Sequence, residues 1–371
     1  MMRKYGIWNR KPQIFLCFLL SLLFLFPEPL RAESIEDSGF FTLVDEAGSV
    51  ILQTGGLVSE GDLYINEQNE RYIVESVNGK TAICRFDGIE ILPKIGCNPK
   101  EAGVLGGENA SLPVIAIYHT HDDESYVPSD GTESIRGDGG IYDVGETLRA
   151  TLETMGFPVL YSEAKHDPHD VNAYSRSRET AAGLLRKGGE VLIDVHRDAV
   201  PPENYETEID GQSATKIKLV VGKSNPNQQS NMEFAKQIKA AMDTEEPGLS
   251  AGIYEGKGDY NQDLTPEAIL IEVGAHTNSK EDAETGVAAF ARALPAALNV
   301  EKAAVMDPRT QTVPDNGGPQ STETDRPDAA AAKPLPEKTA SRWNILWVVL
   351  ILGAGAGCAY YLIQRFGNAE E

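Results

Sequence analysis

Cysteine is scarce in this sequence. Of its four cysteines, Cys17 and Cys358 lie in apolar segments near the two ends of the 371-residue chain. At most one disulfide is therefore left for the rest of the chain, between Cys84 and Cys97. Outside the cytoplasm this pair could close a small loop, or it could remain as two free thiols.

Positive charge is also in short supply, since 33 lysines and arginines face 56 aspartates and glutamates and leave a net charge of −23. This balance argues against binding to nucleic acid or to anionic lipid through a general basic field. No internal repeat is evident, and the length is sufficient for two domains with appendages.

The first 34 residues have the layout of a secretory signal. Four basic residues precede an apolar run of 13 residues at 14–26, which is short for a membrane-spanning helix. Leu30-Arg31-Ala32 is a poor cleavage site. Residues 1–34 are therefore expected to be either a cleaved signal peptide or an uncleaved anchor.

A second apolar segment lies near the C-terminus. Residues 345–363 contain no charge over 19 positions, and at about 1.5 Å per residue this length matches the hydrocarbon core of a bilayer. Aromatic side chains such as Trp343 and Tyr361 lie towards its ends, as in membrane-interface belts. We therefore expect a transmembrane helix at 343–364 and a short tail at 365–371.

Residues 301–342 are rich in proline, threonine, aspartate and alanine, and are expected to form a disordered tether. Together with the signal, the tether and the transmembrane helix predict a membrane-anchored protein. Its residues from about 35 to 342 would lie outside the cytoplasm.

Residues 35–108 are expected to form a small β-rich domain. Asn78-Gly79 is a strong hairpin signal. Three segments around it are typical of strands, at 61–66, 71–77 and 81–86. No chemistry is evident here, so we interpret this domain as a spacer or a docking module.

Residues 109–300 alternate between short apolar strands and amphipathic helices. We expect strands at 114–118, 158–161, 191–195, 216–221 and 268–273, and helices at 145–155, 171–187, 228–242 and 280–298. This alternation predicts an α/β fold with a mostly parallel sheet covered by helices on both faces. In such folds active sites lie beyond the carboxyl ends of the strands.

Residues whose side chains could bind a metal ion or transfer a proton lie at three of these strand ends. His119, His121 and Glu124 follow the first strand, His196 ends the third, and Glu272 ends a late one. In a parallel sheet these ends share one edge, so the residues are expected to converge. Imidazole and carboxylate are the usual ligands of a hydrolytic zinc, which keeps one position open for water.

A zinc site made of two histidines and one glutamate fits this pattern. His121, Glu124 and His196 are the expected ligands, because an H-x-x-E pair in a turn can direct both side chains at one ion. His119 would share a strand face with His121, so it could replace His121 or support it by a hydrogen bond. Glu272, at a desolvated strand end, is either the general base or a structural partner of an arginine.

The neighbours of His196 have weaker assignments. Asp194 and Asp198 flank it, and a carboxylate could orient its imidazole. Asp194 could equally be buried structure. Arg197 could bind an anionic group of a substrate or form a surface ion pair.

Other polar residues have ordinary explanations. The loop His166-Asp167-Pro168-His169-Asp170 is similar to a metal motif, but Asp170 is better explained as a helix N-cap. His276 is interpreted as a loop histidine. Arg176 and Arg178 are interpreted as part of a charged helix face.

Several segments resemble the stage II sporulation protein P family of endospore-forming bacteria. They occur in order across residues 110–300. They are His119-Thr120-His121-Asp122-Asp123-Glu124-Ser125-Tyr126, Tyr174-Ser175-Arg176-Ser177-Arg178-Glu179, Asp194-Val195-His196-Arg197-Asp198, and Tyr260-Asn261-Gln262-Asp263-Leu264 with Ile271-Glu272-Val273-Gly274. A looser resemblance links the same site to zinc-dependent N-acetylmuramoyl-L-alanine amidases.

This resemblance implies a peptidoglycan hydrolase that cuts the amide between the muramic acid lactyl group and L-alanine, with peptide cross-links as a further target. It implies action in engulfment, at the mother-cell membrane, together with stage II sporulation proteins D and M. It assigns Zn²⁺ to His121, Glu124 and His196, and acid/base catalysis to Glu272. The amidases place their ligand glutamate before the first helix, where Glu146 is the nearest candidate.

Two other functions fit the same residues. A metallocarboxypeptidase-like peptidase, suggested by the same H-x-x-E and histidine order, would cut the stem peptide and leave muramic acid substituted. A wall-binding scaffold without catalysis is the third interpretation, and the intact ligand set argues against it.

Overall fold

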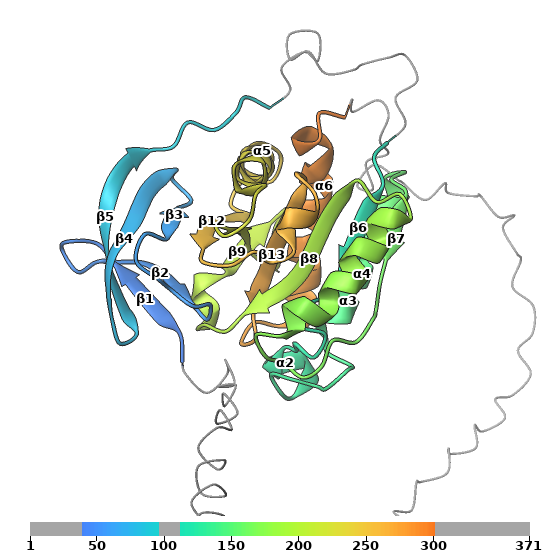
Figure 1. The fold of residues 1–371 in the computed structure, drawn as a ribbon, viewed down its shortest axis with the longest axis horizontal. Helices are drawn as coiled ribbons and strands as arrows, with labels where there is room; N and C mark the ends of the chain where they lie inside the picture. Colours follow the sequence, from blue (N-terminus) through green and yellow to red (C-terminus); the bar gives the residue numbers. More distant parts are fainter. Residues whose placement is uncertain (1–38, 96–111, 301–371) are drawn as a thin grey trace, which may run out of the picture. The chain divides into compact units, whose positions relative to one another are not determined.

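The computed structural model describes residues 39–95 and 112–300 (Figure 1). Within these residues no helix is long and apolar enough to cross a membrane. Cys84 is a buried free thiol. The segments expected as signal or anchor, tether, transmembrane helix and tail lie outside the described residues, at 1–34, 301–342, 343–364 and 365–371, as do Cys17, Cys97 and Cys358.

One sheet of eleven strands runs through the described chain, in the order β2-β1-β5-β4-β3-β12-β11-β13-β8-β6-β7. The strands span Phe41–Val44 (β1), Val50–Thr54 (β2), Leu63–Ile65 (β3), Glu70–Asn78 (β4), Thr81–Ile89 (β5), Ile115–Tyr118 (β6), Val159–Tyr161 (β7), Val191–Asp198 (β8), Ile217–Gly222 (β11), Ser250–Gly256 (β12) and Ala268–Ala275 (β13). A separate hairpin joins Glu206–Ile209 (β9) to Gln212–Thr215 (β10).

The sheet is mixed. Four neighbouring strands run parallel, in the order β7, β6, β8 and β13. β11 runs antiparallel to β13 and parallel to its other neighbour, β12. The N-terminal strands pair antiparallel except where β1 meets β5. The expected parallel arrangement therefore holds for the four strands around the candidate site, and it is wrong for the sheet as a whole.

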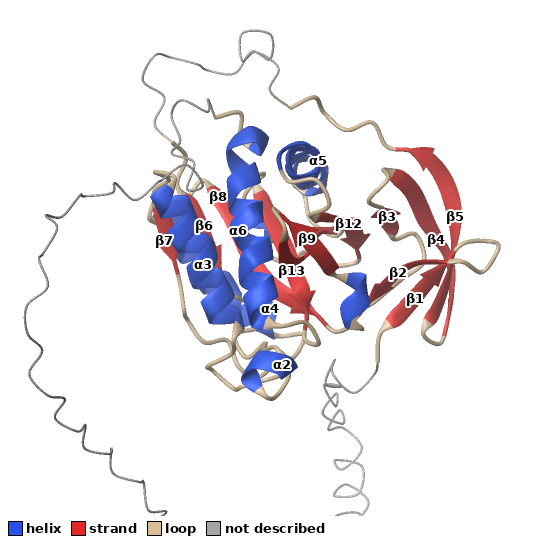
Figure 2. Ribbon diagram, turned by 180° about the vertical axis from the view of Figure 1, so that it is seen from behind, coloured by secondary structure: helices blue, strands red, loops and turns tan. Residues whose placement is uncertain are grey.

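Helices cover both faces of the sheet, as their amphipathic patterns predict. The helices α3 (Ile141–Thr154), α5 (Gln228–Glu245) and α6 (Lys280–Ala297) lie along one face and share a hydrophobic core with it (Figure 2). The opposite face of β6 packs against α4 (Ala173–Arg186). A short helix, α2 (Val127–Asp130), follows the first histidine motif.

The N-terminal strands, which we expected as a β-rich domain, continue the same sheet. β3 pairs antiparallel with β12, and side chains such as Leu43 and Val74 pack against Val220 and Tyr254 of the central strands. Val220 points away from the three-helix core, because side chains alternate along β11. The face that carries α4 is therefore also covered by the N-terminal strands, and the candidate site lies between these two covers.

The junction of β3 with β12 depends on a glycine. Gly252 has a φ of +90°, and a Cβ atom there would collide with the carbonyl oxygen of Ile65. Glycine adopts this left-handed conformation without strain. β12 is missing from the strands expected from the sequence, because Gly248, Gly252 and Gly256 interrupt its apolar pattern.

Replacing Gly252 with alanine should destabilise the fold by roughly 2–4 kcal/mol, because a collision adds to the strain of the backbone. Gly248 supplies a matched control. Its φ is +91°, but the atom nearest to an added Cβ is 3.5 Å away, so Gly248→Ala should cost about 1 kcal/mol. Urea unfolding measures both losses, and equal losses would contradict a role for the close approach of β3.

Candidate metal centre

Neighbouring strands and one loop bring the expected site residues together. The loop after β6 carries His121 and Glu124, β8 carries His196, and Glu272 of β13 is the register partner of His196. The His121 and His196 ring centres are 5.2 Å apart. His196 Nδ1 lies 3.4 Å from Glu124 Oε1. These four residues therefore occupy one region of the fold.

His196 is held between two carboxylates. Its Nε2 lies 3.0 Å from Asp194 Oδ1, and its Nδ1 faces Glu124. Burial alone would lower the pKa of His196, but Asp194 and Glu124 raise that pKa well above its ordinary value. The surroundings therefore favour a positive charge at this position.

Asp194 is fixed by a residue of the first motif. Thr120 donates to it twice, from its backbone N–H over 2.8 Å and from its hydroxyl over 2.6 Å. Burial alone would raise the pKa of Asp194, but the charge of His196 and the bonds from Thr120 lower it. Asp194 is thus an ionised carboxylate beside His196, but His196 Nε2 makes no aligned hydrogen bond among the described residues, so its role in orienting the imidazole stays a prediction.

Glu124 is placed by the backbone of β8. The Arg197 N–H donates to Glu124 Oε2 over 2.9 Å, which leaves Oε1 directed at His196. The Arg197 guanidinium is buried and donates to the carbonyl oxygens of Ser125 and Glu133. Arg197 therefore holds the loop that carries Glu124, and contact between Arg197 and a substrate stays a prediction.

His119 does not share a face with His121, so that expectation is wrong. β6 ends at Tyr118, and strand alternation does not extend to the histidine pair. The ring nitrogens of His119 lie 3.0 Å from the Val195 carbonyl oxygen and 3.1 Å from the Tyr161 hydroxyl. Burial lowers the pKa of His119 to about 4. His119 is therefore a neutral ring whose two nitrogens contact β8, at Val195, and β7, at Tyr161.

His121 lies between two other imidazoles. Its ring stacks on His169 with centres 3.8 Å apart and planes 13° apart, and it crosses the His196 ring at 77°. Burial and the neighbouring imidazoles keep the pKa of His121 well below its ordinary value. Its Nδ1 is buried without a hydrogen-bond partner among the described residues. A neutral imidazole with such a nitrogen suits metal ligation.

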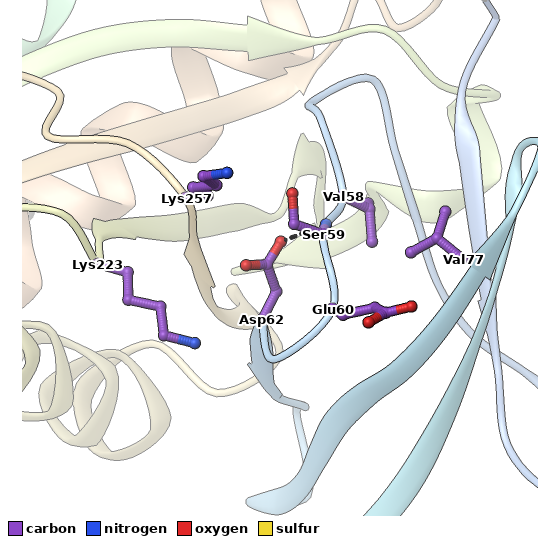
Figure 3. A pocket seen from close by; sticks show the side chains of 7 residues that line it. All are labelled: Val58, Ser59, Glu60, Asp62, Val77, Lys223 and Lys257. Carbon is purple, nitrogen blue, oxygen red and sulfur yellow. Dashed lines mark hydrogen bonds between the residues drawn. The ribbon is translucent and has the colours of Figure 1, made fainter.

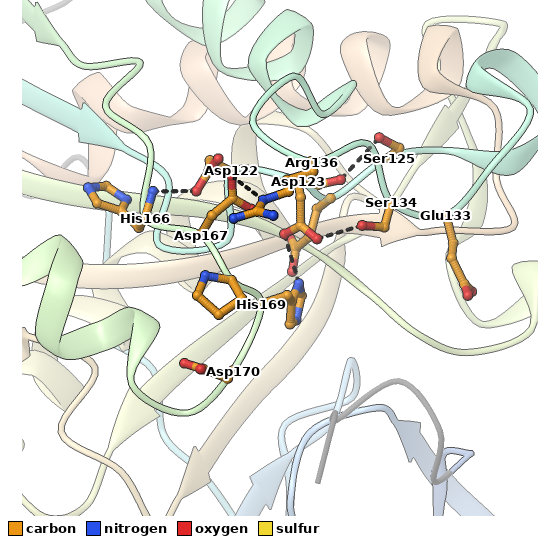
Figure 4. Close-up of polar contacts among 12 residues, drawn as sticks. Asp122, Asp123, Ser125, Glu133, Ser134, Arg136, His166, Asp167, His169 and Asp170 are labelled. Atoms are coloured by element: carbon orange, nitrogen blue, oxygen red, sulfur yellow. Dashed lines mark hydrogen bonds and ion pairs between the residues drawn. The ribbon is translucent and has the colours of Figure 1, made fainter. Parts of the chain in front are cut away.

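The loop at 166–170 adjoins the site, contrary to our interpretation. His169 Nδ1 lies 2.9 Å from Asp123 Oδ1, and Asp123 Oδ2 accepts a hydrogen bond of 2.5 Å from Ser134 (Figure 4). One possible ligand atom from each of His121, Asp123 and His169 lies within 4.8 Å of the others. This cluster could hold a metal ion.

Arg176 fixes this loop instead of lying on a charged helix face. It donates to the His166 carbonyl oxygen over 2.5 Å and to Asp170 Oδ1 over 2.8 Å, and it contacts the Pro168 carbonyl oxygen. The N-cap of α4 is Asn172, whose N–H donates to Asp170. Asp170 is therefore part of the turn before the helix and not its N-cap.

Glu272 belongs to a row of ionisable side chains across three strands. Its register partners are His196 on β8 and Lys218 on β11. Burial raises the pKa of Glu272 to about 7; Asp198 adds to this shift, and Lys218 opposes it. Its Oε2 is buried without a hydrogen-bond partner within the described chain. Such a carboxyl group can exchange a proton near neutral pH.

Lys218 is a buried cation that the sequence does not reveal. It is 1% exposed, forms an ion pair with Asp198 and donates to the Thr54 hydroxyl over 3.0 Å. Asp198 also accepts from the Gly55 N–H at 2.7 Å and from the Tyr205 hydroxyl at 2.9 Å. Asp198 thus anchors the end of β2 to β8 and is not the carboxylate that orients the neighbouring imidazole.

Two tyrosines stand beside the histidines. Tyr174, at the start of α4, stacks on His196 at 6.3 Å between ring centres. Tyr260 meets the Tyr174 ring edge-on at 5.3 Å. Tyr260 and Asn261 have φ values of 50° and 57°, a strained conformation that the surroundings must maintain.

A clamp between two distant segments maintains this strain. Asn261 donates from Nδ2 to the Tyr174 carbonyl oxygen and to the Ser177 hydroxyl, both over 3.0 Å. Arg178 binds both carboxylate oxygens of Asp263, at 2.7 and 2.6 Å. Arg178 is therefore part of this clamp, although its side chain is 43% exposed on a face of α4 as expected.

Two further candidates lie apart from the histidines. Glu146 lies on the exposed side of α3 and pairs with Arg149, so the structure gives no support to Glu146 as an alternative ligand. His276 Nε2 lies 3.9 Å from Glu133 Oε2, and His276 lines a separate pocket of about 450 Å³.

In the metal-free protein, Glu272 should make the fold less stable as the pH rises. Its pKa of about 7 in the folded protein exceeds the ordinary 4.5, so the folded state binds the proton more tightly than the unfolded state. The resulting contribution to the free energy of unfolding is complete below about pH 4 and is lost as the pH rises through 7. Glu272→Gln removes this loss, which is on the order of 3 kcal/mol. Urea unfolding with chelator at pH 5 and pH 8 compares the two proteins. An identical pH dependence would contradict a raised pKa.

Two solved structures are similar to the described fold. The N-acetylmuramoyl-L-alanine amidase from Clostridium difficile 630 aligns with 51% of this chain and 98% of its own, at 16% identity and a TM-score of 0.34. A candidate N-acetylmuramoyl-L-alanine amidase from Neisseria meningitidis aligns with 51% of this chain and 97% of its own, at 15% identity and a TM-score of 0.31.

Sequence comparison gives a more direct relationship. Stage II sporulation protein P from Bacillus subtilis (strain 168) is 30% identical in an alignment 197 residues long that covers 48% of this chain and 49% of that protein. The chain thus spans about half the length of this curated relative. The family model for stage II sporulation protein P matches residues 62–295. The chain belongs to the stage II sporulation protein P family.

Proposed function

We propose that this protein is a zinc-dependent peptidoglycan hydrolase that cleaves the N-acetylmuramoyl-L-alanine amide. The observation that carries the proposal is the convergence of His121, Glu124 and His196 beside Glu272. Two imidazoles and one carboxylate form the ligand type of a hydrolytic zinc. Beside them stands a carboxyl group whose raised pKa suits proton transfer near neutral pH.

The geometry around His196 fits one tetrahedral ion. Two ligands at zinc distances of about 2.0–2.1 Å lie about 3.3 Å apart in a tetrahedron, and His196 Nδ1 lies 3.4 Å from Glu124 Oε1. Asp194 meets the other ring nitrogen, as in carboxylate–histidine–zinc arrangements. The buried Nδ1 of His121, which has no hydrogen-bond partner among the described residues, would be the third donor after a shift of its ring, since in the described structure three ligand atoms lie within 4.8 Å of one another only in the set His121, Asp123 and His169.

The ring planes favour His196 over His169 as the second imidazole ligand. A ring nitrogen binds a metal through a lone pair that lies in the ring plane. The stacked His121 and His169 rings are nearly parallel with centres 3.8 Å apart, so an ion bound by both would lie outside the plane of at least one ring. The His121 and His196 planes cross at 77° and can converge on one point. We therefore assign His169 and Asp123 to holding the His121 ring in place.

Zinc at this position would act as the Lewis acid for the scissile amide carbonyl. Glu272 would take the proton of the attacking water and pass it to the leaving nitrogen. Asp194 would keep His196 in one orientation, and Thr120 would keep Asp194 ionised. Tyr174 and Tyr260 would cover one side of the site and limit access of bulk water.

The cellular setting of this activity is part of the proposal. Membership of the sporulation family supports action on the wall during engulfment, in company with stage II sporulation proteins D and M. The apolar segments at both ends of the sequence support a membrane anchor with the catalytic residues outside the cytoplasm. The net charge of −23 argues against nucleic acid as a partner.

The Glu272→Gln protein should retain zinc. Its rate of releasing stem peptides from purified sacculi should fall by at least 100-fold, because the amide side chain cannot carry the proton. Mass spectrometry of the products identifies the bond that is cut. Products in which muramic acid keeps part of its peptide would show a peptidase instead of an amidase. Full activity in the variant would remove Glu272 from the mechanism.

The two possible imidazole pairs can be separated by metal content. His196→Ala should lower the bound zinc from about one equivalent to near zero, because it removes a ligand. His169→Ala should retain most of the zinc and weaken its affinity by roughly 10-fold, because it removes only a support for His121. The reverse result would place the ion between His121, Asp123 and His169. Absence of zinc from the wild-type protein would favour a non-catalytic scaffold.

A further inference from the structure

The segment that follows β12, residues 257–263, changes from exposed to buried within a few positions. Lys257 is exposed and lines a pocket of about 500 Å³ together with Glu60 and Asp62 (Figure 3). Asn261 is 2% exposed and bonds to residues of α4. A buried amide needs hydrogen-bond partners, and the partners of Asn261 lead towards the candidate metal centre.

Three further buried side chains continue from Asn261. They are Ser177 of α4, Thr120, which follows β6, and Asp194 of β8, and each is at most 2% exposed. Asn261 Nδ2 lies 3.0 Å from Ser177 Oγ, which lies 2.8 Å from Thr120 Oγ1. Thr120 Oγ1 lies 2.6 Å from Asp194 Oδ2. Asp194 Oδ1 then lies 3.0 Å from His196 Nε2, so the chain ends beside a proposed zinc ligand.

The hydrogen bonds of this chain point towards Asp194. A hydroxyl group has one proton to donate, and Thr120 uses its proton on the Asp194 carboxylate. In the contact between the two hydroxyls, Ser177 is therefore the donor and Thr120 the acceptor. The Tyr174 carbonyl oxygen, 3.2 Å from Ser177 Oγ, is the longer alternative for this proton. Ser177 accepts from the Asn261 amide, which is the donor at the head of the chain.

The neighbours of Asn261 fix the orientation of its amide group. Nδ2 also donates to the Tyr174 carbonyl oxygen over 3.0 Å, and a carbonyl oxygen can only accept. Oδ1 faces Arg178 Nη1 at 3.4 Å, and a guanidinium group can only donate. Both neighbours therefore place the nitrogen towards Ser177. The φ of Asn261 is 57°, a left-handed value that asparagine adopts more readily than most residues.

The bond from Asn261 to Tyr174 acts on the aromatic side of the site. Tyr174 stands at the start of α4, and its ring meets His121 edge-on with ring centres 5.5 Å apart. The same ring lies nearly parallel to His196, with centres 6.3 Å apart. Asn261 is thus connected to both proposed imidazole ligands, to His196 through Asp194 and to the pair through Tyr174.

We propose that Asn261 is a positioning residue of the metal centre. Its amide selects the one hydrogen-bonding pattern in which Ser177 donates to Thr120 and Thr120 donates to Asp194, and this pattern holds the Asp194 carboxylate beside His196. Polar partners outside the ligands contribute about 10- to 100-fold to metal affinity. The inference rests on the proposed function, since that function assigns zinc to His196.

Asn261→Gly tests the proposal in the full-length protein in detergent. Glycine adopts a positive φ without strain, so this change removes the amide and keeps the path of the backbone. Competition with a chelator should show a zinc affinity roughly tenfold weaker than that of the wild type, because Asp194 loses the chain that holds it. An unchanged zinc affinity would overturn the proposal.

Ser177→Ala breaks the chain at its second member and leaves the bond between Asn261 and Tyr174. Alanine favours the helix in which Ser177 lies, so the variant should fold. Its zinc affinity should fall roughly three- to tenfold. With Co²⁺ in place of zinc, the visible absorption reports the ligand geometry and should change in both variants. Wild-type Co²⁺ spectra in both variants would contradict a positioning role.

Asn231→Ala is the matched control. Asn231 is also fully buried, and its Nδ2 donates to the carbonyl oxygens of Thr265 and Pro266, both over 3.0 Å. It supports the same connection between β12 and β13 without leading to Asp194. Asn231→Ala should lower the free energy of unfolding in urea and leave the zinc affinity and the Co²⁺ spectrum unchanged. Equal losses of zinc affinity in Asn231→Ala and Asn261→Gly would show a general structural effect and would overturn the proposal.

Metal binding separates this proposal from the proposed function. A wild-type protein without zinc, or a His196→Ala protein that retains it, would refute the assignment of zinc to His196 and this proposal with it. Zinc that depends on His196 but not on Asn261 would refute the positioning role alone. Because neither readout uses cleavage of the wall, a protein that binds zinc through His196 and Asn261 but releases no stem peptide would refute the amidase and retain the positioning role.

Discussion

Buried charge at the centre of the sheet constrains the rest of this fold. Lys218, Glu272 and His196 lie in register on β11, β13 and β8, and each would be costly to bury without partners. Asp198 and Thr54 bind Lys218, while the carboxylates of Asp194 and Glu124 lie 3.0 and 3.4 Å from the ring nitrogens of His196. Because some of these partners come from other segments, the first loop and the N-terminal strands must fold onto the central strands. This dependence explains why β1–β5 continue the main sheet.

The carboxylates of Asp194 and Glu124 also favour the binding of a cation beside His196. Without metal, His196 between two carboxylates holds a proton at a pKa well above its ordinary value. A zinc ion would have to displace that proton, and the two carboxylates would then stabilise the ion instead. Nearby, His121 stays neutral because burial and its neighbouring imidazoles disfavour its protonated form. Under the proposed zinc assignment, the site would combine one ligand that resists protonation, His121, with another, His196, that exchanges a proton for metal.

The sequence predicts the residues of the site that lie at the carboxyl ends of parallel strands, because strand direction alone places those ends at one edge of the sheet. The ends of β6 and β8 were expected from their apolar runs, and parallel neighbours bring their polar residues together whatever the rest of the fold does. The sequence could not reveal the contacts made by long-range packing. Lys218 stands in an apolar run with no sign of its ion pair to Asp198. The stacking of His169 on His121 depends on where the loop held by Arg176 lies.

The clamp formed by Asn261 and the Arg178–Asp263 pair shows how such long-range contacts shape one side of the candidate metal centre. Arg178 of α4 and Asp263, which lies before β13, form a bidentate ion pair, and this pair holds the segment in which Tyr260 has a left-handed backbone. The strain is maintained only while α4 and this segment stay joined. Tyr260 in turn lies against the residues that follow β12, the strand that carries the N-terminal strands at the edge of the sheet. One wall beside the histidines therefore runs from α4 to the residues after β12, and it is held by contacts between segments that lie far apart in the sequence.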